Sequence, residues 1–259
     1  NGLILYTLQC RNHVLTPLHE RFGIVFSDGA IRQAVAEHNR VCQLIQAIGE
    51  YRKEAHPCLT GYEFHILTMA TYVAPKNMLI PVLEETLEEL RTREPDTKKY
   101  RARVVLVGSE VDDVDVVKLI EDCGAYVCAD RFCYGSFPGR DEIILTEDED
   151  PLTQICRQYM NRAQCARYMN QEKIQGRRAY VAKLAEDYHA DGIIYEQMKF
   201  CDPWAYERTV GTQVLRDEYH YPVLSVDRPW AVGHSGQLRT RVQAFVESIE
   251  IKKIQGGGK

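Results

Sequence analysis

The sequence predicts an α/β protein in which a parallel, Rossmann-like sheet is flanked by helices and preceded by a helical segment. Short, continuous apolar runs such as 103–108 are typical of strands buried on both faces of a parallel sheet. Helical stretches separate these runs at the spacing that right-handed crossover connections need. The first 95 residues or so carry only helical periodicity.

The helical segment divides into three predicted helices. Ser27 and Asp28 can cap the first, whose apolar residues recur every three or four positions until Pro57 ends the pattern. The second helix covers about 61–73. The third covers about 78–91, with leucines on one face and glutamates on the other, which we interpret as a solvated face.

The polar connector 94–99 is the predicted domain boundary. We expect residues 1–98 to be the end of a truncated N-terminal domain with its linker. Residues 99–259 are expected to form a C-terminal α/β domain. Because the chain opens abruptly on Asn1, we interpret it as a piece of a longer protein.

The α/β part is predicted to alternate strands and helices. The expected strands are 103–108, 125–130, a short one at 143–145, 191–200 and 221–226. The expected helices are 114–122, 151–160, 176–189, 203–219 and a last one capped by Ser235.

Composition excludes several classes of protein. A net charge of −5 without a basic run argues against nucleic acid as a partner. No apolar stretch approaches the roughly 18 to 20 residues that a membrane span needs. The nine scattered cysteines indicate free thiols in a reducing, cytoplasmic setting. Three of them fall in apolar helical patterns and are predicted to be small buried hydrophobes: Cys42, Cys123 and Cys156.

Cys201 is the first candidate for chemistry. It ends the predicted strand 191–200 and precedes a helix start, with Asp202 as expected N-cap and Pro203 at the first helical position. Ligands bind at this carboxyl edge in open α/β sheets. The helix dipole there should favour the ionised sulfur, which binds metal or attacks as a nucleophile. Asp202 and Trp204 are candidate neighbours of that sulfur, with helix cap and core aromatic as their alternative roles.

Further residues at or near this edge are candidates for binding a metal or a ligand. Cys133 follows the second strand, so it either joins Cys201 in one metal site or lies there by coincidence. Its spacing from Cys128 does not fit a local zinc site. The loop 108–113 has neither a dinucleotide fingerprint nor a P-loop, which argues against nucleotide binding. Arg239 and Arg241 can form structural ion pairs or hold a phosphate-bearing ligand.

The motifs around Cys201 resemble a known family. Lys199-Phe-Cys-Asp-Pro-Trp204, then Asp227-Arg-Pro229 and the segment 236–245, are similar to the benzoyl-CoA reductase and 2-hydroxyacyl-CoA dehydratase family of iron–sulfur enzymes. The resemblance covers nearly the whole chain, with further matching segments at 39–44, 60–63, 119–125 and 130–136. The stretches 134–139 and 246–254 are most similar to a dehydratase-like catalytic subunit of ATP-dependent benzoyl-CoA reductase.

This resemblance implies a heteromeric, anaerobic, cytoplasmic enzyme that acts on an acyl-CoA. Each of two related subunits would hold a [4Fe–4S] cluster through three cysteines. Two of them come from an N-terminal domain that we expect to lie outside this chain, and the third matches Cys201. A separate iron–sulfur activator would hydrolyse the ATP and deliver electrons one at a time. Three thiolates leave one iron with an open position, which four would close.

Four functions remain open on the sequence alone. The first is dearomatising reduction of benzoyl-CoA, and the second is 2-hydroxyacyl-CoA dehydration through a ketyl radical. The third is a non-catalytic role in electron relay or structure. The fourth is a cysteine-nucleophile hydrolase, which would need a histidine near Cys201 in space.

Overall fold

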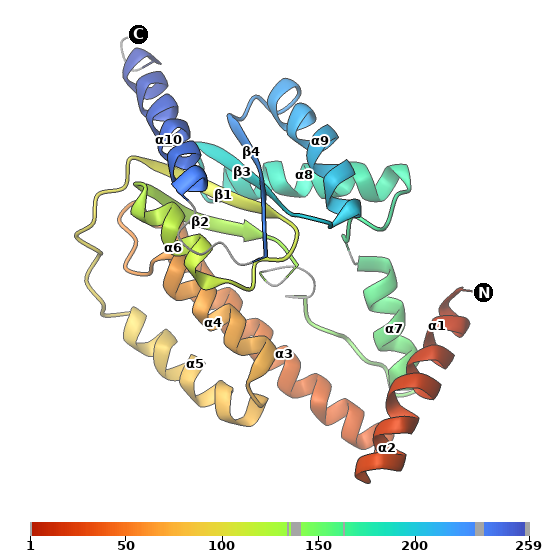
Figure 1. Ribbon diagram of the computed structural model, residues 1–259. Coiled ribbons are helices and arrows are strands. Elements are labelled where there is room, and N and C mark those ends of the chain that lie inside the picture. Colours follow the sequence, from red (N-terminus) through yellow and green to blue (C-terminus); the bar gives the residue numbers. More distant parts are fainter. Residues whose placement is uncertain (1, 134, 136–140, 163, 231–235, 257–259) are drawn as a thin grey trace.

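The computed structural model describes residues 2–133, 135, 141–162, 164–230 and 236–256. A four-stranded parallel sheet lies at its centre, with the strand order β2-β1-β3-β4 (Figure 1). The strands are β1 (Ala102–Gly108), β2 (Ala125–Arg131), β3 (Gly192–Met198) and β4 (Val223–Arg228). The predicted α/β class with a parallel sheet is therefore confirmed.

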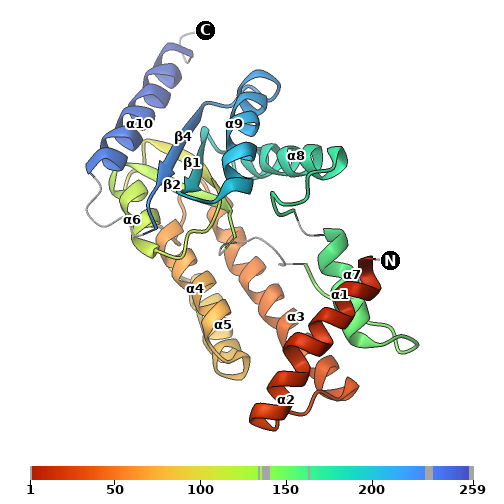
Figure 2. The ribbon, with the colours of Figure 1, turned by 45° about the vertical axis from the view of Figure 1, so that its right-hand side comes forward.

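Two pairs of helices sandwich this sheet. One face is covered by α6 (Val114–Asp122) and α10 (Gly236–Gly256), the other by α8 (Gln171–Asp187) and α9 (Asp202–Asp217). Figure 2 shows the two pairs on opposite sides of the strands. Along β1, Val104 and Leu106 pack toward α6 and α10, whereas Val105 and Val107 pack toward α8 and α9. The uninterrupted apolar run is thus explained by burial on both faces.

Helices precede the sheet in the chain, as expected. They are α1 (Gly2–Cys10), a π-helical turn (Arg11–Leu15), α2 (Thr16–Phe22), α3 (Asp28–Glu50), a 3-10 turn (Tyr51–Lys53), α4 (Gly61–Val73) and α5 (Lys76–Leu90). A separate apolar core joins α3, α4 and α5. Ser27 caps α3 by accepting the Ala30 N–H, as predicted. Later in the chain, α7 (Pro151–Arg162) packs against α1 (Figure 1).

Three local predictions need correction or lie outside the structure. No strand forms at 143–145, because the amide of Asn39 accepts the N–H of Ile143 and donates to its carbonyl, each at 2.8 Å. Helix α8 begins at Gln171 rather than at 176, since Asn170 caps it by accepting the Lys173 N–H. The predicted cap Ser235 lies outside the described residues.

A buried carboxylate fastens the helical segment to the sheet. Glu121 of α6 accepts the N–H groups of Gly61 and Tyr62, which open α4, and that of Val127 in β2. Burial raises the pKa of Glu121 to about 7, although these three N–H groups act in the opposite direction. The approach is so close that a Cβ on Gly61 would lie 2.5 Å from the carbonyl oxygen of Val127.

The cysteines behave as small hydrophobes where this was predicted. Cys42, Cys123 and Cys156 are buried, and all nine cysteines are free thiols. Among the described residues, no helix combines the length and the apolar character that crossing a bilayer demands.

Replacing Gly108 by alanine should destabilise the fold by about 3 kcal/mol or more. Gly108 ends β1 at φ +146°, and a Cβ there would lie 1.9 Å from the carbonyl oxygen of Glu196. Gly176→Ala is the matched control, because that glycine lies inside α8 with open space around its Cα. It should stabilise the protein by about 0.5–1 kcal/mol. Urea unfolding measures the stability of both variants. Equal changes in the two would contradict the steric role of Gly108.

Stability should fall as the pH rises from about 5 to 8, and Glu121→Gln should make this fall shallower. Folding raises the pKa of Glu121 from 4.5 to about 7. Its protonated side chain therefore stabilises the fold fully below pH 4.5, and this stabilisation is lost as the pH rises through about 7. That loss amounts to roughly 3 kcal/mol at most. Glu196, whose pKa burial also raises to about 7, still titrates in the variant. Urea unfolding free energies at both pH values test this, and an unchanged slope would refute it.

Candidate functional site

The carboxyl ends of the strands bring four connecting segments to one edge of the sheet. Ser109 follows β1, Cys133 follows β2, the turn 199–201 follows β3, and Pro229 follows β4. In open parallel sheets this edge is where ligands bind.

Backbone contacts fix the turn that carries Cys201. The Lys199 N–H donates to the carbonyl of Arg228 at 2.8 Å, and the Cys201 N–H donates to that of Met198 at 3.1 Å. Between them, Phe200 takes a left-handed conformation (φ +70°) and is 97% exposed. A bulky residue rarely adopts this conformation unless its surroundings impose it. The turn is therefore held from both sides.

The helix after this turn begins one residue earlier than predicted. The carbonyl of Cys201 accepts the Ala205 N–H at 3.0 Å, so Cys201 is the N-cap residue and Asp202 the first residue of α9. The thiol of Cys201 makes no capping hydrogen bond of regular geometry, although the backbone N–H of Trp204 lies close enough to lower its pKa. Its sulfur is half-buried.

The expectation of an ionised sulfur at Cys201 is wrong for the protein alone. Burial raises the pKa of this thiol, and this effect exceeds the lowering by the backbone at Trp204 and by the cation of Arg167. The free cysteine is thus a thiol and would lose its proton on binding a metal.

Two further thiols approach Cys201. The N–H of Cys133 donates to the carbonyl of Ser109 at 2.9 Å, which places it at the predicted edge. Burial raises the pKa of the Cys133 thiol to about 12, the neighbouring Cys165 and Cys201 raise it further, and the indole of Trp204 lowers it. Sequence reasoning missed Cys165, because it lies between α7 and α8 and follows no strand.

Arg177 holds the Cys165 segment against the helix of Cys201. Its guanidinium donates to the carbonyls of Cys165 and Tyr168 at 3.1 and 3.4 Å, and to the carboxylate of Glu207 in α9 at 2.8 Å. Arg177 and Glu207 are 2% and 5% exposed, so both charges are shielded from water. The pair is stable only because its hydrogen-bond geometry compensates the loss of hydration.

These thiols are neighbours and not a complete metal site. Among the residues that the structure describes, no three histidine, cysteine or acidic side chains are arranged to hold a metal ion. Cys201 suits iron as a soft sulfur donor. A cluster with three protein ligands would need further thiolates beside it.

The two predicted neighbours of the sulfur differ in their surroundings. Trp204 is buried and packs edge-on against Tyr195, with ring centroids 6.2 Å apart. Its indole N–H has no partner at hydrogen-bonding geometry among the described residues, although it lies close enough to Cys133 to lower that pKa. Asp202 is exposed at the first position of α9.

A buried ion pair lies beneath this edge and was not predicted. Arg228 at the end of β4 donates to Glu196 of β3 at 3.0 Å, and both side chains are 2% exposed. The hydroxyl of Ser109 donates to Glu196 at 2.9 Å and accepts the Met198 N–H at 2.5 Å. The guanidinium also donates to the carbonyl of Trp230 at 2.9 Å. Their pairing could not be recognised, because Glu196 lies inside the predicted strand 191–200 and Arg228 just after the predicted strand 221–226, and no local pattern joins the two.

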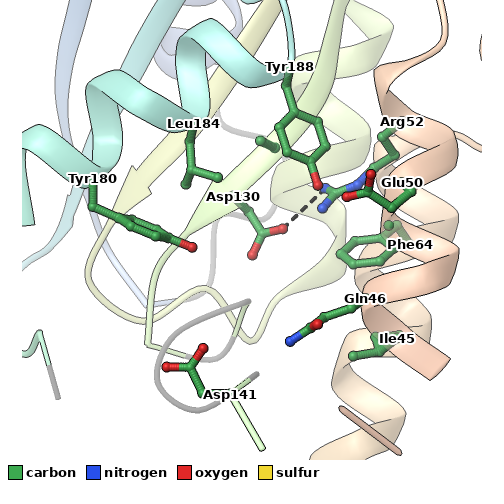
Figure 3. Close-up of a pocket in the computed structure, with 12 residues that line it drawn as sticks. Ile45, Gln46, Glu50, Arg52, Phe64, Asp130, Asp141, Tyr180, Leu184 and Tyr188 are labelled. Carbon is green, nitrogen blue, oxygen red and sulfur yellow. Dashed lines mark hydrogen bonds and ion pairs between the residues drawn. The ribbon is translucent and has the colours of Figure 1, made fainter. Parts of the chain in front are cut away.

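A cavity of about 200 Å³ lies over the end of β2, between α3 and α8. Figure 3 shows Arg52 reaching across it to Asp130, with Tyr180 and Asp141 on the opposite side. The Arg52–Asp130 pair is 3.1 Å long and buried, and the guanidinium lies 3.5 Å above the ring of Phe64. The cavity is therefore part of the junction between the helical segment and the sheet.

Ser109→Ala should cost about 1–3 kcal/mol of stability, because it leaves the Met198 N–H and one Glu196 oxygen without their partner. Ser248→Ala is the control, since that hydroxyl only donates to a carbonyl of its own helix. It should change stability by less than about 0.5 kcal/mol. Urea unfolding compares the two; equal losses would show that Ser109 does not support the turn.

Comparison with known proteins gives a consistent set of relatives. The family described as "2-hydroxyglutaryl-CoA dehydratase, D-component" matches residues 6–249. The chain is 23% identical over 229 residues to the (R)-phenyllactyl-CoA dehydratase beta subunit of Clostridium sporogenes, covering 88% of this chain and 59% of that protein. It is 23% identical over 253 residues to a benzoyl-CoA reductase subunit of Thauera aromatica, covering 95% and 63%.

A third relative is the (R)-2-hydroxyglutaryl-CoA dehydratase subunit beta of Acidaminococcus fermentans. Identity is 25% over 247 residues, which cover 94% of this chain and 64% of that protein. The chain thus spans somewhat less than two thirds of the length of these curated relatives. The match to the family includes the whole sheet and the turn of Cys201.

Proposed function

The chain belongs to the 2-hydroxyglutaryl-CoA dehydratase D-component family, and on this basis we propose that it is an iron–sulfur subunit of an enzyme acting on an acyl-CoA. The observation that carries this proposal is the placement of Cys201. Its sulfur is half-buried at the carboxyl edge of β3, faces the backbone N–H of Trp204 in the first turn of α9, and sits on a turn held by backbone hydrogen bonds from both sides.

In this proposal Cys201 supplies one thiolate ligand to a [4Fe–4S] cluster. The family resemblance assigns the other two ligands to an N-terminal domain, and Cys133 is an additional candidate at the same edge. When bound, such a cluster supplies one electron at low potential, or an open iron position for an oxygen ligand. The chain's own contribution is to hold the sulfur still and to exclude water from one side of it.

Two neighbours would tune that sulfur. The backbone N–H of Trp204 lies close enough to the Cys201 sulfur to lower its pKa, and the indole N–H of the same residue lies beside Cys133. Asp202 lies in the first turn of α9, next to Cys201 in the chain. Hydrogen bonds to cluster sulfurs and the degree of burial set reduction potentials.

ATP would be hydrolysed by a separate iron–sulfur activator, and a related dehydratase-like subunit would complete the catalytic part. The sequence of this chain has neither a P-loop nor a dinucleotide fingerprint, which supports placing ATP elsewhere. The names of the relatives, as subunits, support a multi-component enzyme.

Two reactions suit such a subunit. Dehydration of a 2-hydroxyacyl-CoA has the support of the matched family's description and of two of the three relatives named above. Dearomatising reduction of benzoyl-CoA has the support of the Thauera relative and of the motif similarity at 246–254. The similar stretch 134–139 lies, apart from Gly135, outside the described residues.

Cys201→Ser should lower the iron and acid-labile sulfide content of the anaerobically purified protein several-fold, because a hydroxyl is a poor ligand for iron–sulfur clusters. Cys58→Ser is the control, as that thiol packs against the core of α3, α4 and α5. Circular dichroism should show both variants folded. Iron content that stays the same in Cys201→Ser would refute the proposed ligand.

Incubating the anaerobic complex, its activator and ATP with each thioester distinguishes the two reactions. Loss of water from a 2-hydroxyacyl-CoA without net electron consumption would assign the dehydratase. Formation of a cyclic dienoyl-CoA, with two electrons consumed for each ring, would assign the reductase. Product analysis by mass spectrometry reads both, and turnover of neither substrate class would contradict the proposal.

A further inference from the structure

A small polar cavity lies on the same edge of the sheet as Cys201. Its volume is about 170 Å³, and it is lined by the residue after β3, the end of β4 and the first two turns of α10. The side chains that matter for its chemistry are Lys199, Asp227, Gln237 and Arg241.

The cavity carries a surplus of positive charge. Within the described part of the chain, the Lys199 ammonium and the Gln237 amide have no hydrogen-bond or ion-pair partner. The guanidinium of Arg241 donates to the carbonyl of Ser225 at 2.6 Å and has further N–H groups to offer. Arg228 also lines the cavity, but Glu196 neutralises it within the protein. The exposed carboxylate of Asp227 offsets only one of the two remaining cations.

The two cations sit on rigid supports. Lys199 directly follows β3, where its N–H is bonded to the carbonyl of Arg228 at 2.8 Å. Arg241 lies one turn into α10 and is tied to β4 through Ser225. Both contacts are made to main-chain carbonyls of β4, so the backbone of Lys199 and the guanidinium of Arg241 are fixed to the same strand. The anchored guanidinium of Arg241 can bind an anion with a small loss of conformational entropy.

We propose that this cavity binds a phosphate or diphosphate group of the coenzyme A part of the substrate. The inference rests on the proposed function for the choice of coenzyme A, and on the cavity alone for the choice of a phosphate. The volume is below the roughly 300–1,000 Å³ of pockets that enclose whole ligands, so it suits one polar group of a larger molecule. Arginine and lysine are the side chains that recognise phosphate.

The position of the cavity agrees with this assignment. Lys199 and Cys201 are two residues apart, so their Cα atoms are separated by about 7 Å at most. A phosphate group held at Lys199 therefore lies on the same rim as the sulfur. The exposed ring of Phe200 lies between the two positions in the chain, where an arm of the ligand would pass.

Titration calorimetry with the complex as purified anaerobically tests the proposal, with coenzyme A as the probe. Lys199→Gln and Arg241→Gln should each weaken binding about tenfold, the effect of losing one charge-assisted hydrogen bond. Asp227→Asn should tighten binding, because it removes the negative charge in the cavity. Lys252→Gln, an exposed lysine near the other end of α10, is the control and should leave the affinity unchanged.

Further ligands identify which group is bound. Pantetheine, which has no phosphate, should bind equally to all variants. Dephospho-coenzyme A should keep the dependence on Lys199 if the diphosphate is the bound group, and lose it if the 3′-phosphate is. Inorganic diphosphate and ADP show whether a free phosphate compound competes for the same cations.

Several outcomes would overturn the inference. Coenzyme A affinity that is the same in wild type, Lys199→Gln and Arg241→Gln would do so, as would binding of diphosphate without binding of coenzyme A. Lys199 is exposed, so its variant should fold even if Arg241→Gln does not. The proposed function fails separately, through unchanged iron content in Cys201→Ser, while the binding experiment needs no cluster.

Discussion

The buried pair of Glu196 and Arg228 is the contact on which the functional edge depends. It joins the ends of β3 and β4, and through the Ser109 hydroxyl it also joins the end of β1. Breaking a buried ion pair typically costs about 3–5 kcal/mol, because one charge is left without its partner. The carbonyl of Arg228 then holds the Lys199 N–H, so the same residue positions the turn of Cys201 and the cavity beside it.

A second set of buried charges connects the helical segment to the sheet. Glu121 holds the start of α4 through backbone N–H groups, and Arg52 reaches Asp130 at the end of β2. The Arg177–Glu207 ion pair joins the segment of Cys165 to α9. Each of these contacts is placed where one chain segment meets another, and each is shielded from solvent. The apolar cores give the layers their stability, while these polar contacts determine how the layers are aligned.

Much of the architecture could be predicted because it follows from local pattern. Apolar runs identified all four strands, and the Ser27 cap identified the start of α3. The strand expected at 143–145 was wrong because a distant side chain, Asn39, satisfies its backbone. The ionised state expected for Cys201 was wrong because burial of the sulfur raises its pKa by more than the helix terminus lowers it. Both errors concern contacts between residues far apart in the sequence.

The sequence by itself determined the order and type of the elements, the free thiols, and the motif at Cys201 that leads to the family. These depend on periodicity and on residue type, which are local properties. Only the tertiary structure decided that Cys165 approaches Cys201, that Glu196 and Arg228 neutralise each other, and that Lys199 and Arg241 share a cavity. Such pairings arise where chain segments far apart in sequence meet at the sheet edge, and no pattern along the chain encodes the distance between them.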